Sequence, residues 1–185
     1  MIITSSIFDI IPILKKGGVI AYPTEAVWGL GCDPFNRESV YRILALKNRP
    51  VHKGLILISG EAEHLTPWKD QLSPEQYQRL VSDTETPTSW VVPDTLIAPE
   101  WVRGDHASVA IRMIQHEQTR ELCSHFGHVL VSTSANTAGH PPALTKDAVS
   151  QYFGDKVDAI FDAPLGHNNQ PSQVKDLLCD TIYRN

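Results

Sequence analysis

Short runs of apolar residues recur along the chain, and each run predicts a buried strand. The runs cover residues 19–22, 54–58, 90–92, 108–114, 129–131 and 158–161. Pro23 directly follows the first run, which is typical of a strand that leads into a loop. The last run and the segment 172–183 are expected to complete one sheet.

Between these runs, apolar residues recur at the spacing of a helix. The helices are expected to begin after Asn36, after Ser73, at His116 and after Thr145, and three of them to end at Pro50, Gly127 and Gly154. Ser73 is followed by a proline and, at the third position, by a glutamine, a combination that starts helices. Because strands alternate with helices, the pattern predicts an α/β fold.

The composition is that of an ordinary globular domain. Hydrophobic residues make up 42% and charged residues 20% of the 185 residues, which disfavours disorder and a coiled coil. This length fits a single domain over residues 1–185. No apolar run approaches the roughly 18 residues of a membrane span, and the N-terminus lacks the features of a signal peptide. Three widely spaced cysteines favour a reduced compartment, so we expect a cytoplasmic protein without membrane contacts.

The chain is acidic overall but contains one basic stretch. Its formal net charge of −5 disfavours a protein that coats nucleic acids through general charge. The stretch 37–53 nevertheless contains Glu38 as its only acid together with five basic residues: Arg37, Arg42, Lys47, Arg49 and Lys53. It is consistent either with a local anion site or with a solvated helix face.

Three segments at the ends of predicted elements carry candidate chemistry. Segment 22–31 follows a strand with Pro-Thr-Glu and two glycines, which places a hydroxyl, a carboxylate and open backbone at a tight turn. Lys47 and Arg49 leave a helix toward Pro50, where they either complement the helix dipole or form a phosphate clamp. Segment 129–136 ends a strand in small polar residues that can bind a phosphate. Each segment taken singly is also compatible with an ordinary structural turn.

In their order and spacing, these segments resemble the YrdC/TsaC family of threonylcarbamoyl-AMP synthases, and the resemblance extends over almost the whole chain. The matching segments are Ala21–Glu25, Leu46–Pro50, Lys53–Ile58, Ser108–Arg112 and Leu130–Asn136, together with Gly139. The short, single-domain bacterial TsaC type fits best, because no C-terminal extension is expected. The resemblance implies an open, twisted mixed α/β sheet with flanking helices and a concave ligand-binding face.

The resemblance also implies a reaction. Family members join L-threonine, bicarbonate or CO2, and ATP into threonylcarbamoyl-adenylate and release diphosphate. Other proteins use this product to modify the tRNA adenosine next to the anticodon. By resemblance, Lys47 and Arg49 are expected to hold the triphosphate and act in catalysis, assisted by Mg2+ but without a metal site formed by the protein. Nucleotide contacts are expected from Ser132, Ser134 and Asn136. Threonine contacts are expected from Thr24, Arg112 and Ser172.

The chain departs from the family pattern at three places. Ala26 stands where many members carry a second threonine, and Ile58 where longer relatives carry a histidine. Segment 83–89 keeps only one proline and the hydroxyl of Ser89 from a Trp-Pro-Gly-Pro-x-Thr pattern. These changes leave open a paralogue that uses another acceptor. A further alternative is a non-catalytic module that binds tRNA or double-stranded RNA through residues 37–53.

Other residues with reactive or aromatic side chains are assigned to packing. Segment Cys123–His128 contains two histidines, but its spacing does not fit a zinc site. Cys32 has no identifiable base nearby and is interpreted as a small buried thiol. The four tryptophans fall in separate elements, so we expect them in the core or at its rim rather than as a stacking platform.

Overall fold

The computed structural model describes residues 1–168 and 170–184, whose strands form one mixed sheet. In spatial order the strands are β1 (Ile2–Thr4), β8 (Ala159–Phe161), β2 (Ile20–Pro23), β3 (Trp28–Gly31), β7 (Leu130–Ser134), β4 (Ile56–Ser59), β6 (Ser108–Met113), β5 (Thr88–Pro93), β9 (Gln173–Asp176) and β10 (Ile182–Arg184). The pairs β1–β8, β8–β2, β4–β6 and β5–β9 are parallel, and the other neighbours are antiparallel. The sheet is open, with β1 and β10 at its edges, which confirms the expected α/β fold class.

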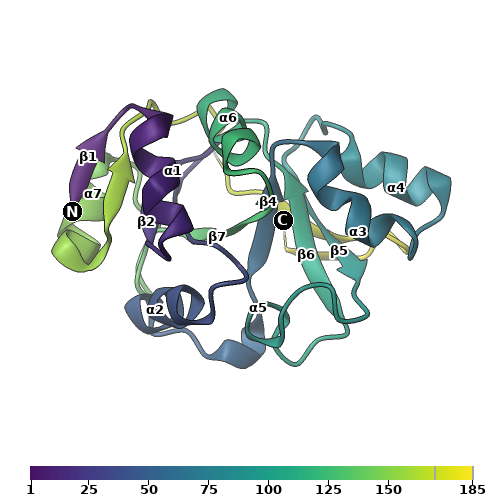
Figure 1. The fold of residues 1–185 in the computed structure, drawn as a ribbon. Helices are drawn as coiled ribbons and strands as arrows, with labels where there is room; N and C mark the ends of the chain where they lie inside the picture. Colours follow the sequence, from purple (N-terminus) through teal and green to yellow (C-terminus); the bar gives the residue numbers. More distant parts are fainter. Residues whose placement is uncertain (169, 185) are drawn as a thin grey trace.

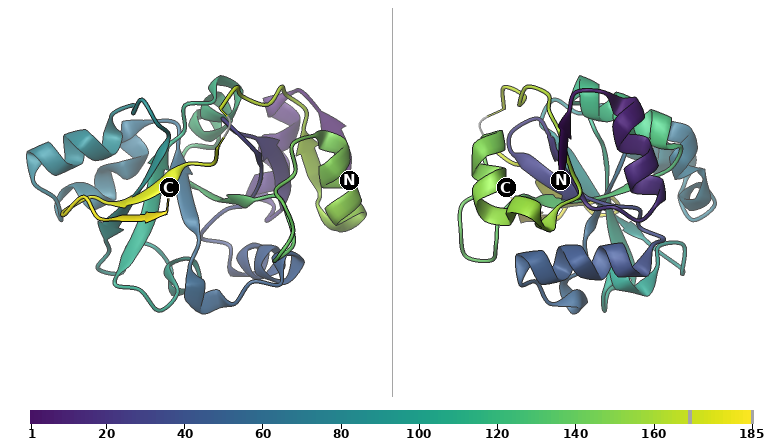
Figure 2. Two further views of the ribbon diagram at one scale, coloured as in Figure 1. Left: turned by 180° about the vertical axis from the view of Figure 1, so that it is seen from behind. Right: turned by 60° about the vertical axis from the view of Figure 1, so that its left-hand side comes forward.

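Helices cover both faces of this sheet (Figures 1 and 2). They are α1 (Ile7–Lys15), α2 (Arg37–Lys47), α3 (Thr66–Lys69), α4 (Pro74–Val81), α5 (Glu100–Arg103), α6 (Glu117–Phe126) and α7 (Lys146–Phe153), with short 3-10 turns at Val51–Lys53, Ala62–Leu65 and Gly154–Lys156. On one face α1 lies beside α6, and on the other α2 lies beside α5 (Figure 1). Within the described residues, no helix has the length and apolar character needed to cross a bilayer.

Side-chain caps start the helices where the sequence predicts them. The side chain of Asn36 accepts a hydrogen bond from Ser39 N–H at 3.0 Å, which caps α2. Ser73 and Gln76 form a reciprocal capping box at the start of α4. The hydroxyl of Thr145 accepts from Ala148 N–H at 3.1 Å and caps α7. These short-range bonds explain why the boundaries can be predicted from the sequence.

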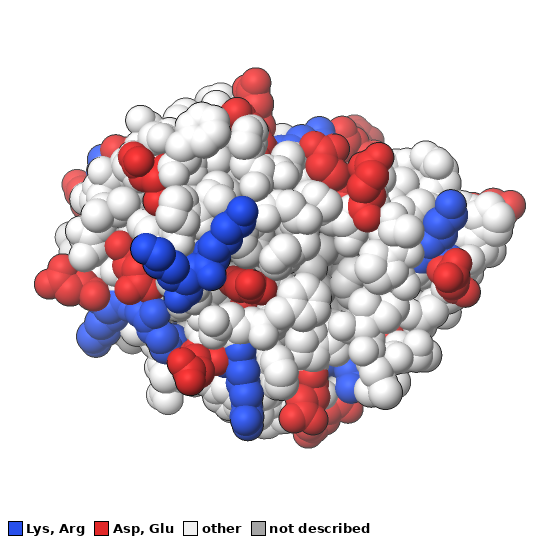
Figure 3. Space-filling model, in the orientation of Figure 1, with Lys and Arg blue, Asp and Glu red and all other residues white. Residues whose placement is uncertain are grey.

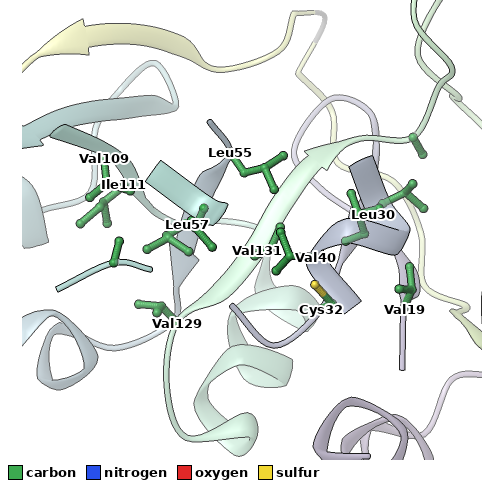
Figure 4. Packing of buried hydrophobic residues seen from close by; sticks show 14 of the residues in the cluster. Val19, Leu30, Cys32, Val40, Leu55, Leu57, Val109, Ile111, Val129 and Val131 are labelled. Atoms are coloured by element: carbon green, nitrogen blue, oxygen red, sulfur yellow. The ribbon is translucent and has the colours of Figure 1, made fainter. Parts of the chain in front are cut away.

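Successive residues of the central strands pack on opposite faces of the sheet. On β7, Leu130 packs with α1 and α6, whereas Val131 packs with α2 and α5. On β4, Ile58 likewise packs with α1 and α6, whereas Leu57 packs with α2 and α5. Figure 4 shows Leu57 and Val131 in the hydrophobic cluster that includes residues of α2 and α5, together with Val40 of α2. Because both faces are covered, the strands read as continuous apolar runs in the sequence.

Segment 22–31 differs from the glycine-containing turn that the sequence predicts, because its second half is a strand. β2 and β3 pair as an antiparallel hairpin, and Gly29 and Gly31 lie within β3. The ring of Tyr22 packs against both glycines. A Cβ atom at Gly31 would lie only 2.5 Å from the carbonyl oxygen of Val131. The glycines therefore allow close packing between strands rather than a turn.

Helix α1 is not singled out by the hydrophobic pattern. It contains Pro12, which removes a backbone donor and normally interrupts a helix. Ile10 and Leu14 are nevertheless completely buried against the sheet and α6. Burial of this apolar stripe stabilises the helix in spite of its proline, so tertiary packing overrides the local signal.

Candidate functional site

One cavity, of about 360 Å3, collects every side chain that the sequence predicts for the site. The predicted residues that line it are Thr24, Lys47, Arg49, Arg112, Ser132, Ser134, Asn136 and Ser172. The volume suits a small-molecule ligand. The three separate sequence segments therefore meet in space, whereas the role of each residue is still a prediction.

Two local features bring the first group of side chains to the cavity. Helix α2 ends at Lys47, and Asn48 takes a left-handed conformation (φ 52°) that turns the chain, so that Arg49 also lines the cavity. On β7, Ser132 and Ser134 are two residues apart and therefore point to the same face of the sheet.

The ammonium group of Lys47 binds the loop that follows β7. Its Nζ donates to the carbonyl oxygens of Ser134 and Asn136, the latter 2.8 Å away, and also to Asn136 Oδ1 at 3.3 Å. A lysine ammonium has three N–H groups, so these acceptors engage all of them. Lys47 thus holds the loop in place and supplies positive charge to the cavity.

Lys47 and Arg49 form a partly desolvated pair of cations. Burial, and to a smaller extent the charge of Arg49, lower the pKa of Lys47 to about 8. Burial also lowers the pKa of Arg49, whose Nε and Nη2 donate to the carbonyl oxygen of Gly54 at 3.1 and 2.8 Å. Two like charges that have lost water are stabilised by a bound anion, because the anion replaces the missing favourable interactions.

The loop after β7 is ordered by its own hydrogen bonds as well. Ser134 Oγ donates to Asn136 Oδ1 at 2.5 Å. Asn136 Nδ2 donates to the carbonyl oxygens of His140 at 2.8 Å and Thr137 at 3.1 Å. The backbone N–H of Ala135 donates to Trp28 of β3 at 2.8 Å. The polar groups of this loop are therefore held in position before any ligand arrives, which lowers the entropic cost of binding.

A second group of lining residues surrounds Arg112 of β6. Its Nη1 lies 3.4 Å from Glu25 Oε2, and both side chains are more than nine-tenths buried. Among the described residues, no acceptor forms a hydrogen bond with the Arg112 guanidinium, and its Nε is buried without a partner. Arg112 therefore keeps its fork of N–H donors for a ligand such as a carboxylate.

Ser172 and Thr24 have defined partners near this arginine. The hydroxyl oxygens of Ser172 and Ser89 lie 3.0 Å apart and are buried. Thr24 Oγ1 donates to the carbonyl oxygen of Val27 at 2.7 Å and closes the turn between β2 and β3. Segment 83–89 departs from the family pattern, yet Ser89 supports Ser172 and Pro87 lines the cavity.

Arg184 is a lining residue that the sequence analysis missed. It lies on β10, and its Nη2 donates to the carbonyl oxygen of Ser172 at 2.7 Å. Burial, followed by the charges of Arg112 and Arg49, lowers its pKa, so three arginines influence one another in this cavity. No motif surrounds Arg184 in the sequence, and only the pairing of β9 with β5 and β10 brings it to the site.

Most of the residues assigned to packing are buried, whereas His125 is exposed and Trp101 and His128 are half-buried. Cys32 and Cys123 are buried and free, and burial raises the pKa of the Cys123 thiol to about 12. No cluster of three or more potential metal ligands occurs in the parts of the chain that are described. Trp68 and Trp90 belong to the core, whereas the buried Trp28 also forms part of the cavity wall. Ala26 lines the cavity too, so the departure from the family pattern there changes the wall itself.

The fold and this cavity define a class: an α/β protein with a cationic, preorganised pocket for a small anionic ligand. Residues 12–185 match the sequence profile of the Sua5/YciO/YrdC family, which is described as "Telomere recombination". Since the match covers nearly the entire chain, the protein belongs to the Sua5/YciO/YrdC family. The resemblance inferred from the motifs is thereby confirmed.

Individual relatives match over almost the full length. A threonylcarbamoyl-AMP synthase of Pseudomonas aeruginosa (strain UCBPP-PA14) is 48% identical over 172 residues, which are 93% of this chain and 92% of the relative. Another, of Cellvibrio japonicus (strain Ueda107), is 46% identical over 171 residues, or 92% and 90%. The crystal structure of P. abyssi Sua5 complexed with L-threonine has a TM-score of 0.85 at 27% identity, and the match covers 95% of this chain. The chain spans about half (53%) of that solved protein.

Proposed function

We propose that the protein is a threonylcarbamoyl-AMP synthase, which converts L-threonine, bicarbonate or CO2, and ATP into threonylcarbamoyl-adenylate and diphosphate. One observation carries the proposal: a single cavity is lined both by Lys47 and Arg49 and by Arg112 with free donors. The first pair suits a triphosphate, and Arg112 suits a carboxylate. The names of relatives that are 46% and 48% identical support the same activity.

The proposed reaction requires no covalent bond between the protein and a substrate. The amine of threonine adds to CO2 and loses a proton to water, which gives a carbamate, and a carbamate oxygen then attacks the α-phosphorus of ATP. The bond from this phosphorus to the bridging oxygen breaks, and its electron pair leaves with diphosphate. Such a step requires alignment and neutralisation of charge rather than a protein nucleophile.

Lys47 and Arg49 neutralise the triphosphate in this proposal. Lys47 acts in two ways, because its charge attracts phosphate and its hydrogen bonds position both the end of β7 at Ser134 and the following loop at Asn136. Ser132, Ser134 and Asn136 then contact the nucleotide through hydroxyl, amide and backbone groups. Arg184 adds positive charge next to Ser172. Preorganised charges of this kind stabilise a transition state without reorganisation during the reaction.

Arg112 binds the carboxylate of threonine, with Thr24 and Ser172 beside it. A guanidinium with unengaged donors matches the two oxygens of a carboxylate in a bidentate arrangement. The related P. abyssi Sua5 was solved in complex with L-threonine, which supports an amino acid as the second ligand. The amine of this amino acid must face the nucleotide, since the carbamate forms there.

The side chains of the cavity do not form a magnesium site. Among the described residues lining it, Glu25 is the only acid, and it is paired with Arg112. Mg2+ prefers oxygen ligands and commonly binds through substrate phosphates with few protein groups. We therefore assign any magnesium to the nucleotide substrate, bound through its phosphate oxygens, and route no step through a protein-held metal.

The alternative of an RNA-binding module is less well supported. Within residues 37–53, Arg42 pairs with Asp158 at 2.9 Å and Arg37 lies over the ring of Trp101. Lys47 and Arg49 turn into the cavity. Figure 3 shows one face of the molecule, on which Lys and Arg are interspersed with Asp and Glu. The basic stretch is thus divided among separate contacts instead of forming a continuous patch for a phosphate backbone.

Our proposal extends to the setting of the reaction. We propose that residues 1–185 act as one domain, which is supported by the pairing of β1 with the distant strand β8. We also propose that the protein acts in the cytoplasm and that tRNA-modification proteins consume the adenylate.

Release of diphosphate tests the proposed function directly. The purified protein is incubated with ATP, threonine and bicarbonate, and each component is omitted in turn. A synthase releases diphosphate only when all three are present. A paralogue with another acceptor would release it with a different amine. Release that is absent in the complete mixture would refute the proposal.

A further inference from the structure

Glu25 is the one acidic side chain among the described residues that line the cavity. The same lining contains five cationic side chains: Lys47, Arg49, Lys53, Arg112 and Arg184. A carboxylate in the wall weakens binding of a nucleotide, because it repels the phosphate groups. Its presence therefore points to a requirement that phosphate binding does not explain.

Glu25 cancels the charge of one of these cations. Its Oε2 lies 3.4 Å from Arg112 Nη1, and both side chains are almost completely buried. Neither Lys47 nor Arg49 has an acidic ion-pair partner in the part of the chain that the structure describes. The charges of Lys47 and Arg49 are therefore not offset by an acid, whereas Glu25 offsets the charge of Arg112, so that the Glu25–Arg112 pair is neutral and Arg184 is the remaining cation on that side.

The carboxylate is held in this position by its surroundings. Glu25 Oε1 accepts a hydrogen bond from the backbone N–H of Gln115 at 2.7 Å. The carbonyl oxygen of Glu25 accepts from Asn168 N–H at 2.9 Å. Gly166 packs so closely that a Cβ atom there would lie 2.5 Å from the same carbonyl. Moving the carboxylate away from Arg112 breaks the hydrogen bond to Gln115 N–H, and the other two contacts fix the backbone from which the side chain extends.

We propose that Glu25 determines which ligand binds beside Arg112, admitting an amino acid and excluding phosphate. This inference rests on the proposed function. An amino acid is zwitterionic and neutral overall, so it suits the neutral pair, and its carboxylate uses the free donors of Arg112. A phosphate group brings net negative charge toward the carboxylate of Glu25. Glu25 supplies the repulsive element of specificity and keeps the triphosphate at Lys47 and Arg49.

Competition binding to the wild-type protein is the first test. The dissociation constant of L-threonine is measured by ligand-observed NMR with and without inorganic diphosphate. We expect diphosphate to leave threonine binding unchanged, because the two ligands occupy different parts of the cavity. Displacement of threonine by diphosphate would overturn the inference without the use of any variant.

The variant Glu25→Gln tests the charge itself. Glutamine retains an acceptor for Gln115 N–H but removes the negative charge beside Arg112. We expect diphosphate now to compete with threonine. The ratio of the dissociation constant of diphosphate to that of threonine should therefore fall by about tenfold or more. Glu38→Gln, at an exposed position on α2 that is not among the residues lining the cavity, removes the same net charge and should leave the ratio unchanged.

An unchanged ratio of the two dissociation constants in Glu25→Gln contradicts the inference. If the ratio is unchanged while both ligands bind more weakly, the role of Glu25 is merely structural. Binding of ATP shows whether the Glu25→Gln variant is folded. If the variant is unfolded, the competition experiment with wild-type protein tests the inference instead. Wild-type protein that binds no threonine refutes the proposed function. Wild-type protein that binds threonine but releases it to diphosphate refutes only the role of Glu25.

Discussion

Lys47 Nζ donates to the backbone carbonyl oxygen of Asn136 at 2.8 Å, and this bond links two segments that are 89 residues apart in the chain. It joins the end of α2 to the loop after β7, and so it assembles this part of the cavity from two elements. The same ammonium also binds the carbonyl of Ser134. Lys47 is thus both a source of charge and the contact that shapes the site.

Lys47→Ala is expected to lower turnover by about 100-fold or more, the scale for removal of one charge-stabilising group. The loss combines weaker neutralisation of the triphosphate with a loop that is no longer fixed. Threonine-dependent release of diphosphate measures it. Lys53→Ala is the matched control, because Lys53 also lines the cavity but is exposed, and less than about fivefold loss is expected there. Near-normal turnover of Lys47→Ala would refute the role of Lys47.

The pH dependence of ATP binding should follow the ionisation of Lys47. Its pKa is lowered to about 8, so the amine is mostly charged at pH 7 and mostly neutral at pH 9. We expect kcat/KM for ATP to fall as the pH rises through about 8, because the neutral amine attracts no phosphate. Bound ATP favours the charged form, so the corresponding fall in kcat lies at higher pH.

Lys47→Arg provides the control for this pH profile. Arginine stays charged throughout the range, so the fall near pH 8 should disappear even if turnover is reduced. A profile that keeps the same midpoint in this variant would show that another group causes it.

Arg184→Gln should raise the KM for ATP by about tenfold, the scale for losing one hydrogen bond to a charged group. The reason is that Arg184 adds positive charge to the cavity next to Ser172. Lys175→Gln is a suitable control, since Lys175 lies in the neighbouring strand β9 but pairs with Asp180. Steady-state kinetics at saturating threonine measure both variants. Equal KM values for the wild type and Arg184→Gln would exclude this contribution.

Ser89→Ala should raise the KM for threonine by about threefold to fivefold, which corresponds to one neutral hydrogen bond. Ser89 Oγ lies 3.0 Å from Ser172 Oγ, and this hydrogen bond fixes the direction of the Ser172 hydroxyl. The KM for ATP should change little. Thr86→Ala removes an exposed hydroxyl from the same segment and serves as the control. Equal effects of the two substitutions would argue against the contact with Ser172.

Much of the fold can be predicted because it depends on neighbouring residues. The caps at Asn36 and Ser73 form bonds within three positions, and the apolar run 54–58 reflects burial on both faces of β4. Helix α1 escapes prediction because its burial against α6 compensates for Pro12. The hairpin of β2 and β3 is not predicted either, because Gly31 is needed for close packing against Val131 of β7, which is distant in the sequence.

The sequence by itself determined the α/β character, most element boundaries and the motifs around Lys47, Arg112 and Ser134. Only the tertiary structure decided that these motifs face one cavity, that Arg184 joins them and that Glu25 neutralises Arg112. The reason is physical: propensity and capping act over a few residues, whereas strand order is selected by burial over the whole chain. Charges that meet across the sheet therefore leave no local pattern in the sequence.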